Sequence, residues 1–151
     1  MAQHLPQGGS VIDARHAPTP QQYADEITRS KFCLVLRCDD PHTSRFVDAV
    51  AAGCIPVIIS DGFHLVVAPF ARTLNYASFS ITIPELLWLK DSISAARFAY
   101  NWPDAITKQL HSALLKARPQ LLWRPTAASK VGKALVKQLD LDCDGSSAPL
   151  G

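Results

Sequence analysis

The sequence has no long apolar run, no excess of charge of one sign and no closely spaced pair of cysteines. Its longest uninterrupted apolar stretch is far too short to cross a bilayer. Among 151 residues, 15 basic and 13 acidic side chains give a formal net charge of +2. They form no basic stripe, so nucleic acid is not an expected partner. With 48% hydrophobic and 19% charged residues, the chain has the composition of one globular domain rather than of a disordered segment.

The N-terminal residues 1–10 lack the apolar stretch of a secretory signal or membrane anchor. We therefore expect either a cytoplasmic chain or one whose preceding region lies outside this sequence. Composition further divides the chain into a flexible N-terminal segment, 1–17, a folded domain, 18–139, and a flexible tail, 140–151.

The four cysteines are Cys33, Cys38, Cys54 and Cys143. No pair has the two-residue separation of a zinc knuckle or a redox motif. Cys33 and Cys54 lie in apolar runs, where a thiol behaves as a small hydrophobic group, so we expect both to be buried and unbonded. Cys38 lies in a polar loop and is the candidate for a reactive thiol.

Apolar runs separated by turn residues predict an α/β fold. Thr19 is placed to cap a helix, and Gly53 to end a second one. The short apolar runs suit buried strands covered on both faces. The expected elements are a helix over 21–30, a strand over 32–36, a loop over 37–43, a helix over 44–52, and strands over 55–59 and 79–83. Helical spacing then predicts helices up to Pro119 and over 131–139.

A strand, loop, helix and strand within about thirty residues form a βαβ unit with parallel strands. The expected fold is therefore a Rossmann-like parallel sheet. In such sheets, ligands bind outside the carboxyl ends of the strands. The helix that begins near Ser44 follows such an end, and its first N–H groups favour an anion.

Two side chains of this helix suit a nucleoside diphosphate. Arg45, in the first turn, offers a planar fork of donors to phosphate oxygens. Asp48, one turn further on the same face, can accept two ribose hydroxyls. The same spacing is also typical of a simple surface ion pair, and the pattern alone does not choose between the two interpretations.

The stretch from Ser30 to Phe63, SKFCLVLRCDDPHTSRFVDAVAAGCIPVIISDGF, resembles the donor-site block of exostosin-family glycosyltransferases. The corresponding parts are Ser30–Leu34, Asp39, Arg45, Asp48, Ala52–Ile58 and Ser60 with Asp61. The later segment Leu74–Glu85, LNYASFSITIPE, is also similar to the family's sequence after that block.

The resemblance implies the C-terminal, donor-binding half of a GT-B architecture. It implies inverting transfer from a nucleotide sugar, usually a UDP-sugar, to a glycan acceptor, without a bound metal or other cofactor. Arg45 would hold the diphosphate and Asp48 the ribose, with Ser44 and Arg37 completing the donor-binding set. The family also implies the Golgi or the endoplasmic reticulum membrane, and admits association with another chain or a second copy.

The sequence departs from the family pattern at Leu36, where the family favours Pro, at Cys38, where it favours Gly, and over His64–Val67, which replaces a Leu-Pro-Phe segment. The acceptor-binding half, which should carry any catalytic base, is not expected within this chain. A second hypothesis is therefore a non-catalytic module that binds a nucleotide sugar or stabilises a partner.

Weaker signals have ordinary explanations. His42 and His64 could act as general bases, but a lone loop histidine is more often solvent-exposed. Trp88, Trp102 and Trp123 could stack on sugars, although tryptophans at helical positions more often pack. Asp140–Gly145 matches only the start of an EF-hand loop, because the position that needs glutamate is Gly151.

Overall fold

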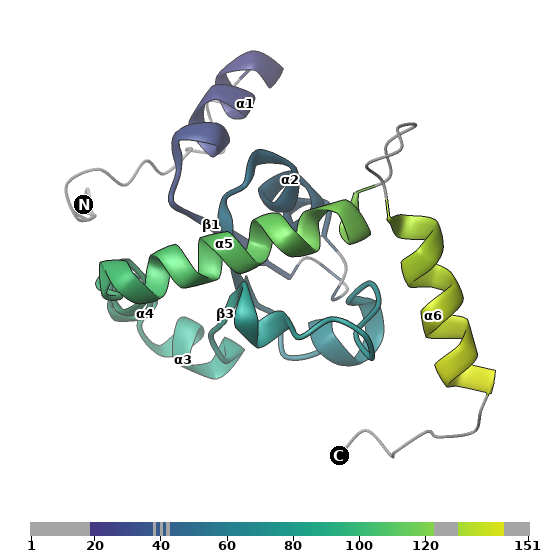
Figure 1. The fold of residues 1–151 in the computed structure, drawn as a ribbon. Helices are drawn as coiled ribbons and strands as arrows, with labels where there is room; N and C mark the ends of the chain where they lie inside the picture. Colours follow the sequence, from purple (N-terminus) through teal and green to yellow (C-terminus); the bar gives the residue numbers. More distant parts are fainter. Residues whose placement is uncertain (1–18, 38, 40, 42, 123–129, 144–151) are drawn as a thin grey trace.

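The computed structural model describes residues 19–37, 39, 41, 43–122 and 130–143 (Figure 1). Within them, helices surround a small parallel sheet. The elements are α1 (Pro20–Arg29), β1 (Phe32–Leu36), α2 (Arg45–Ala52), β2 (Ile55–Ile59), a π-helical turn η1 (Phe63–Val67), a 3₁₀ turn η2 (Tyr76–Ser78), β3 (Ile81–Thr82), α3 (Glu85–Lys90), α4 (Ser92–Tyr100), α5 (Asp104–Leu121) and α6 (Val131–Cys143).

The sheet has the order β1-β2-β3, and both pairs of neighbours are parallel. Phe32 lies opposite Ile55, and Val57 lies opposite Ile81. The predicted α/β class, the parallel pairing and the bounds of the first two strands are confirmed. The last helix is longer than the expected 131–139, since α6 continues to Cys143. The flexible segments and the domain bounds stay predictions, because residues 1–18 and 144–151 lie outside the described part of the chain.

Helix ends follow the predicted capping chemistry. The Thr19 hydroxyl accepts from the Gln22 N–H at 3.3 Å, and the Gln22 side chain accepts from the Thr19 N–H at 2.9 Å. This reciprocal arrangement is a capping box. Gly53, at φ 79°, occupies the left-handed region that ends α2 and returns the chain to β2.

Two apolar clusters fill the two faces of the sheet. On one face, Val35 and Ile58 pack with Phe46 of α2 and Leu114 of α5. On the other, Val57 and Ile81 pack with Ala99 of α4. Figure 1 shows α5 as the long helix that crosses the sheet, with α6 beside its end. The two clusters thus cover both faces of β2, the central strand.

Two predictions about strands are wrong in detail. Leu34 and Leu36 are 44% and 40% exposed, so β1 is not covered on both faces. The reason is that β1 is an edge strand, whereas α3 and α4 pack over β2 and β3. The third strand contains only Ile81–Thr82, because Phe79 ends the η2 turn and Ser80 donates its hydroxyl to a carbonyl of that turn at 2.8 Å. Burial of Phe79 therefore reflects a packed turn.

The expectation of free thiols at Cys33 and Cys54 is also wrong. The two sulfurs form a disulfide, with Cα atoms 5.8 Å apart. The physical reason is the parallel register. Cys33 lies opposite Pro56, so Cys54, two residues before Pro56, is its diagonal neighbour across the strand pair. Two apolar runs that form neighbouring strands thus bring their cysteines into bonding range.

Candidate functional site

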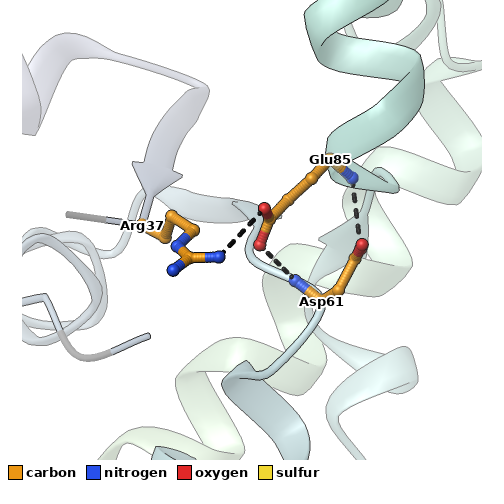
Figure 2. Close-up of polar contacts among 3 residues, drawn as sticks. All are labelled: Arg37, Asp61 and Glu85. Carbon is orange, nitrogen blue, oxygen red and sulfur yellow. Dashed lines mark hydrogen bonds and ion pairs between the residues drawn. The ribbon is translucent and has the colours of Figure 1, made fainter. Parts of the chain in front are cut away.

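The carboxyl ends of all three strands carry polar side chains. Arg37 follows β1, Asp61 follows β2 by two residues, and Glu85 begins α3 shortly after β3. Figure 2 shows that these three side chains meet at the carboxyl ends of the strands. Because α/β folds bind ligands outside the carboxyl ends of their strands, we take this end of the sheet as the candidate site.

Glu85 is the centre of the contacts drawn in Figure 2. Its Oε1 accepts from the Asp61 N–H at 2.9 Å, and its Oε2 accepts from Nη1 of Arg37 at 3.3 Å. In return, the Glu85 N–H donates to Oδ1 of Asp61 at 3.1 Å. The reciprocal bonds connect the turn after β2 to the start of α3. These hydrogen bonds fix the backbone at the carboxyl ends of the strands.

The ion pair of Arg37 with Glu85 is only partly shielded from water. The side chains are 47% and 21% exposed, respectively. Exposed pairs of this kind contribute little to stability, so the Arg37 guanidinium can exchange Glu85 for another anion at small cost. Arg37, predicted as a donor-binding residue, is thus at the expected edge but is paired in this structure.

The N-terminus of α2 lies after the loop that leaves β1. Ser44 precedes the helix, is exposed, and makes no side-chain capping bond. The Arg45 N–H donates to the Thr43 hydroxyl at 3.3 Å, and the Phe46 N–H to the Thr43 carbonyl at 3.4 Å. Both distances are long for N–H···O bonds. An anion could therefore compete for these donors.

Arg45 and Asp48 both contact Tyr23 of α1, rather than each other. The Arg45 guanidinium carbon lies 4.8 Å from the centre of the Tyr23 ring. The Tyr23 hydroxyl donates to Oδ2 of Asp48 at 3.1 Å. The simple ion pair between Arg45 and Asp48 is therefore not what the structure shows. Instead, one tyrosine orients both side chains that were predicted to hold the donor.

The loop before α2 also reaches the turn after β2. A Cβ placed on Gly62 would lie 3.0 Å from Cγ of Pro41, tighter than ordinary contact. The absence of a side chain at Gly62 therefore lets the two loops of this edge approach closely. Cys38, proposed as a reactive thiol, and His42, proposed as a base, lie outside the described residues.

His64 is neither free nor fully exposed. Its Nε2 lies 3.1 Å from the Thr82 hydroxyl, and its ring meets those of Phe63 and Tyr76 edge-on at 5.4 Å. Burial lowers the pKa of His64 below its usual 6.5. Contrary to the expectation of a solvent-exposed loop histidine, His64 ties η1 to the end of β3 as a neutral ring.

The lowered pKa of His64 predicts a pH-dependent stability. Its contribution is present above pH 6.5 and is lost as the pH falls through the lower folded-state pKa. We expect acidification to reduce the free energy of unfolding of the wild type more than that of His64→Gln, whose amide can still bond Thr82. Urea titrations between about pH 8 and about pH 5 would measure this. Parallel curves for the two proteins would contradict it.

Two contributors were missed from the sequence. Glu85 was noted only as the end of a similar segment, and Tyr23 lay within the helix expected over 21–30 without a role of its own. Applying the strand-end rule to β3 would have found Glu85. The contacts of Tyr23 with α2 join residues 25 positions apart, and no spacing rule predicts them.

The tryptophans and the helices carry less functional information. Trp88 and Trp102 pack against the cluster around Val57, so the packing interpretation is confirmed for both. Trp123 lies outside the described residues.

Among the helices that the structure describes, none combines the length and apolarity needed to span a membrane.

The residues of this chain that match known proteins include the candidate site. The Exostosin GT47 domain matches residues 1–95. The probable glucuronoxylan glucuronosyltransferase IRX7 of Arabidopsis thaliana is 44% identical over 63 residues, which cover 42% of this chain and 13% of that protein. The exostosin-1 homolog of Caenorhabditis elegans is 34% identical over 92 residues, which cover 61% of this chain and 22% of that protein.

The chain thus spans about a fifth or less of the length of the relatives it matches. The family match reaches residue 1, further than the motifs alone had indicated, and it includes β1, α2, β2, β3 and α3 with their strand-end side chains. Since this match covers more than half of the sequence, the chain belongs to the exostosin GT47 family of glycosyltransferases.

Proposed function

We propose that this chain is the donor-binding part of a glycosyltransferase and that it binds a nucleotide sugar, in particular a UDP-sugar. One observation carries the proposal: at the carboxyl edge of the parallel sheet, an exposed arginine occupies the first turn of α2. A helix N-terminus and a guanidinium together suit a diphosphate.

In this proposal the diphosphate lies at the N-terminus of α2, against Arg45 and the backbone near Ser44. Arg37 reaches it by leaving Glu85. Asp48, held by Tyr23, accepts the ribose hydroxyls. Charge that develops on the diphosphate leaving group is then stabilised by arginine and helix N–H groups instead of a metal ion.

The rest of the reaction lies beyond these residues. Inverting transfer to a glycan acceptor needs a base and an acceptor site, which we place in the second half of a GT-B architecture. We propose that this half is provided by further polypeptide or by another chain. The length of the relatives, of which this chain spans 13–22%, favours this arrangement.

We propose a location in the Golgi or the endoplasmic reticulum. The disulfide between Cys33 and Cys54 supports it, because such bonds persist in oxidising compartments and are rare in the cytosol. The same bond argues against the cytoplasmic alternative.

A second candidate function is a non-catalytic module that binds a nucleotide sugar or stabilises a partner. This candidate is also favoured because the chain covers only a small part of the length of its relatives. The two candidates differ in whether transfer occurs once an acceptor half is present.

The test is calorimetric titration of the folded chain with UDP, UDP-glucose and uridine. We expect UDP and UDP-glucose to bind with similar affinity and uridine to bind far more weakly, because uridine lacks the diphosphate that Arg45 and the α2 N-terminus would hold. Absence of UDP binding at millimolar concentration, in a chain shown to be folded, would contradict the donor-site proposal. The partner-stabilising alternative would then stand.

A further inference from the structure

A cavity lies at the opposite end of the sheet from the candidate donor site. Its volume is about 320 Å³. Lys31, before β1, and Ile55, the first residue of β2, mark the amino ends of the strands on its wall. The C-terminal ends of α1 and α2 and the first turns of α5 complete it. The volume is at the lower end of the range for small-molecule sites.

Two lysines, Lys31 and Lys108, and the imidazole of His111 line the cavity. Lys108 and His111, one turn apart on α5, make no hydrogen bond or ion pair in the part of the chain that the structure describes. Lys31 pairs at the rim with Asp104, at 2.9 Å. No carboxylate is among the described residues that line the cavity. The pKa of the Asp104 carboxyl is lowered by its hydrogen bond with Lys31 and also by the charge of Lys108, so Lys108 lies near this carboxylate without forming an ion pair with it. An anion in the cavity can therefore still bind the Lys108 ammonium.

The hydroxyl groups of the cavity wall can act only as hydrogen-bond acceptors toward a ligand. Thr28, Ser30 and Thr107 each donate their hydroxyl hydrogen to the carbonyl four residues earlier, at 2.8, 2.7 and 3.1 Å. A hydroxyl whose hydrogen is engaged offers only lone pairs to other groups. The wall thus presents hydrogen-bond acceptors beside its cations. An inorganic anion such as sulfate cannot use these acceptors, because it has no hydrogens to donate.

The C-terminal end of α2 adds less negative potential to this cavity than an uncapped helix end would. The carbonyl of Val50, in the last turn of α2, accepts from the Gly53 N–H at 3.2 Å. The next carbonyl, of Ala51, accepts from the Arg118 guanidinium. Because these groups already have donors, the negative end of the α2 dipole is partly neutralised within the protein.

We propose that this cavity is a binding site for a small polyhydroxylated anion, of the chemical class of sugar acids and sugar phosphates. The anionic group lies against Lys108 and His111, and the ligand hydroxyls donate to Thr28, Ser30 and Thr107. This site is separate from the proposed donor site and does not depend on it, because the two lie at opposite ends of the strands.

The experiment titrates the whole chain with glucuronate, glucose 6-phosphate, inorganic phosphate and glucose, followed by amide chemical shifts in NMR spectra. We expect at least one of the two acidic sugars to bind more tightly than phosphate and glucose, with shifts in the first turns of α5. The stronger of the two identifies the anionic group. Lys108→Ala should weaken binding about tenfold, the scale of one charge-assisted hydrogen bond.

Lys116→Ala is the matched control, since Lys116 is an exposed lysine of the same helix outside the cavity lining. It should leave the affinity unchanged, as should Arg45→Ala, which tests the other site. Failure of both acidic sugars to bind would overturn the proposal. Equal binding of glucose, or unchanged affinity in Lys108→Ala, would overturn it as well.

Discussion

Reduction of the disulfide between Cys33 and Cys54 is expected to lower the free energy of unfolding by about 3 kcal/mol, the chain-entropy value for a loop of this length. The bond joins residues 21 positions apart and encloses the whole of α2. Without it, the unfolded chain gains conformations that the closed loop forbids. Urea titration with and without reductant measures the difference, once mass mapping has established the bond.

The double variant Cys33→Ala, Cys54→Ala is the control for this experiment. It should be as unstable as the reduced wild type, apart from the small cavity left at the buried Cys54. Its unfolding should not respond to reductant. If the wild type also fails to respond, or if mapping finds both thiols free, the disulfide does not support the fold.

Replacing Arg45 by Ala is expected to weaken UDP binding by about 1.5–3 kcal/mol, the scale of a hydrogen bond to a charged group. Arg45 is exposed, so its removal should leave the fold intact. Asp48→Asn should cost less, because an amide oxygen still accepts from ribose, and it should affect UDP and UDP-glucose alike. Calorimetry on each variant provides the affinities.

Two further variants sharpen this result. Tyr23→Phe keeps the ring beneath Arg45 but removes the hydroxyl that donates to Asp48, so it should retain most of the affinity. Arg97→Ala removes an exposed arginine from α4 and should have no effect. If Arg45→Ala binds UDP as well as the wild type does, the nucleotide site lies elsewhere.

The elements that the sequence predicts well are those fixed by local pattern. β1 and β2 begin and end where expected because each is an apolar run bounded by polar or turn residues. The Thr19 cap and the Gly53 stop depend only on residues within a few positions in the sequence. By contrast, the run 79–83 contains Ser80 and Thr82, and Phe79 belongs to a turn, because side-chain hydroxyls there bond backbone carbonyls.

The candidate site could be predicted only in part. Arg45 and Asp48 were found because helical spacing puts them near the start of α2. Their shared partner, Tyr23, comes from another helix, and the pairing of Arg37 with Glu85 joins two strand ends. The disulfide was missed although its signal was present: parallel strands that start in register place Cys33 beside the start of β2.

The enclosure of α2 by the Cys33–Cys54 bond has a topological consequence. Main chain and disulfide together form a covalent ring that contains the loop after β1 and all of α2. A single peptide-bond break anywhere in that ring leaves one connected molecule. New chain ends could therefore be placed in the loop before α2, beside the proposed diphosphate position, without the two fragments separating while the disulfide remains oxidised.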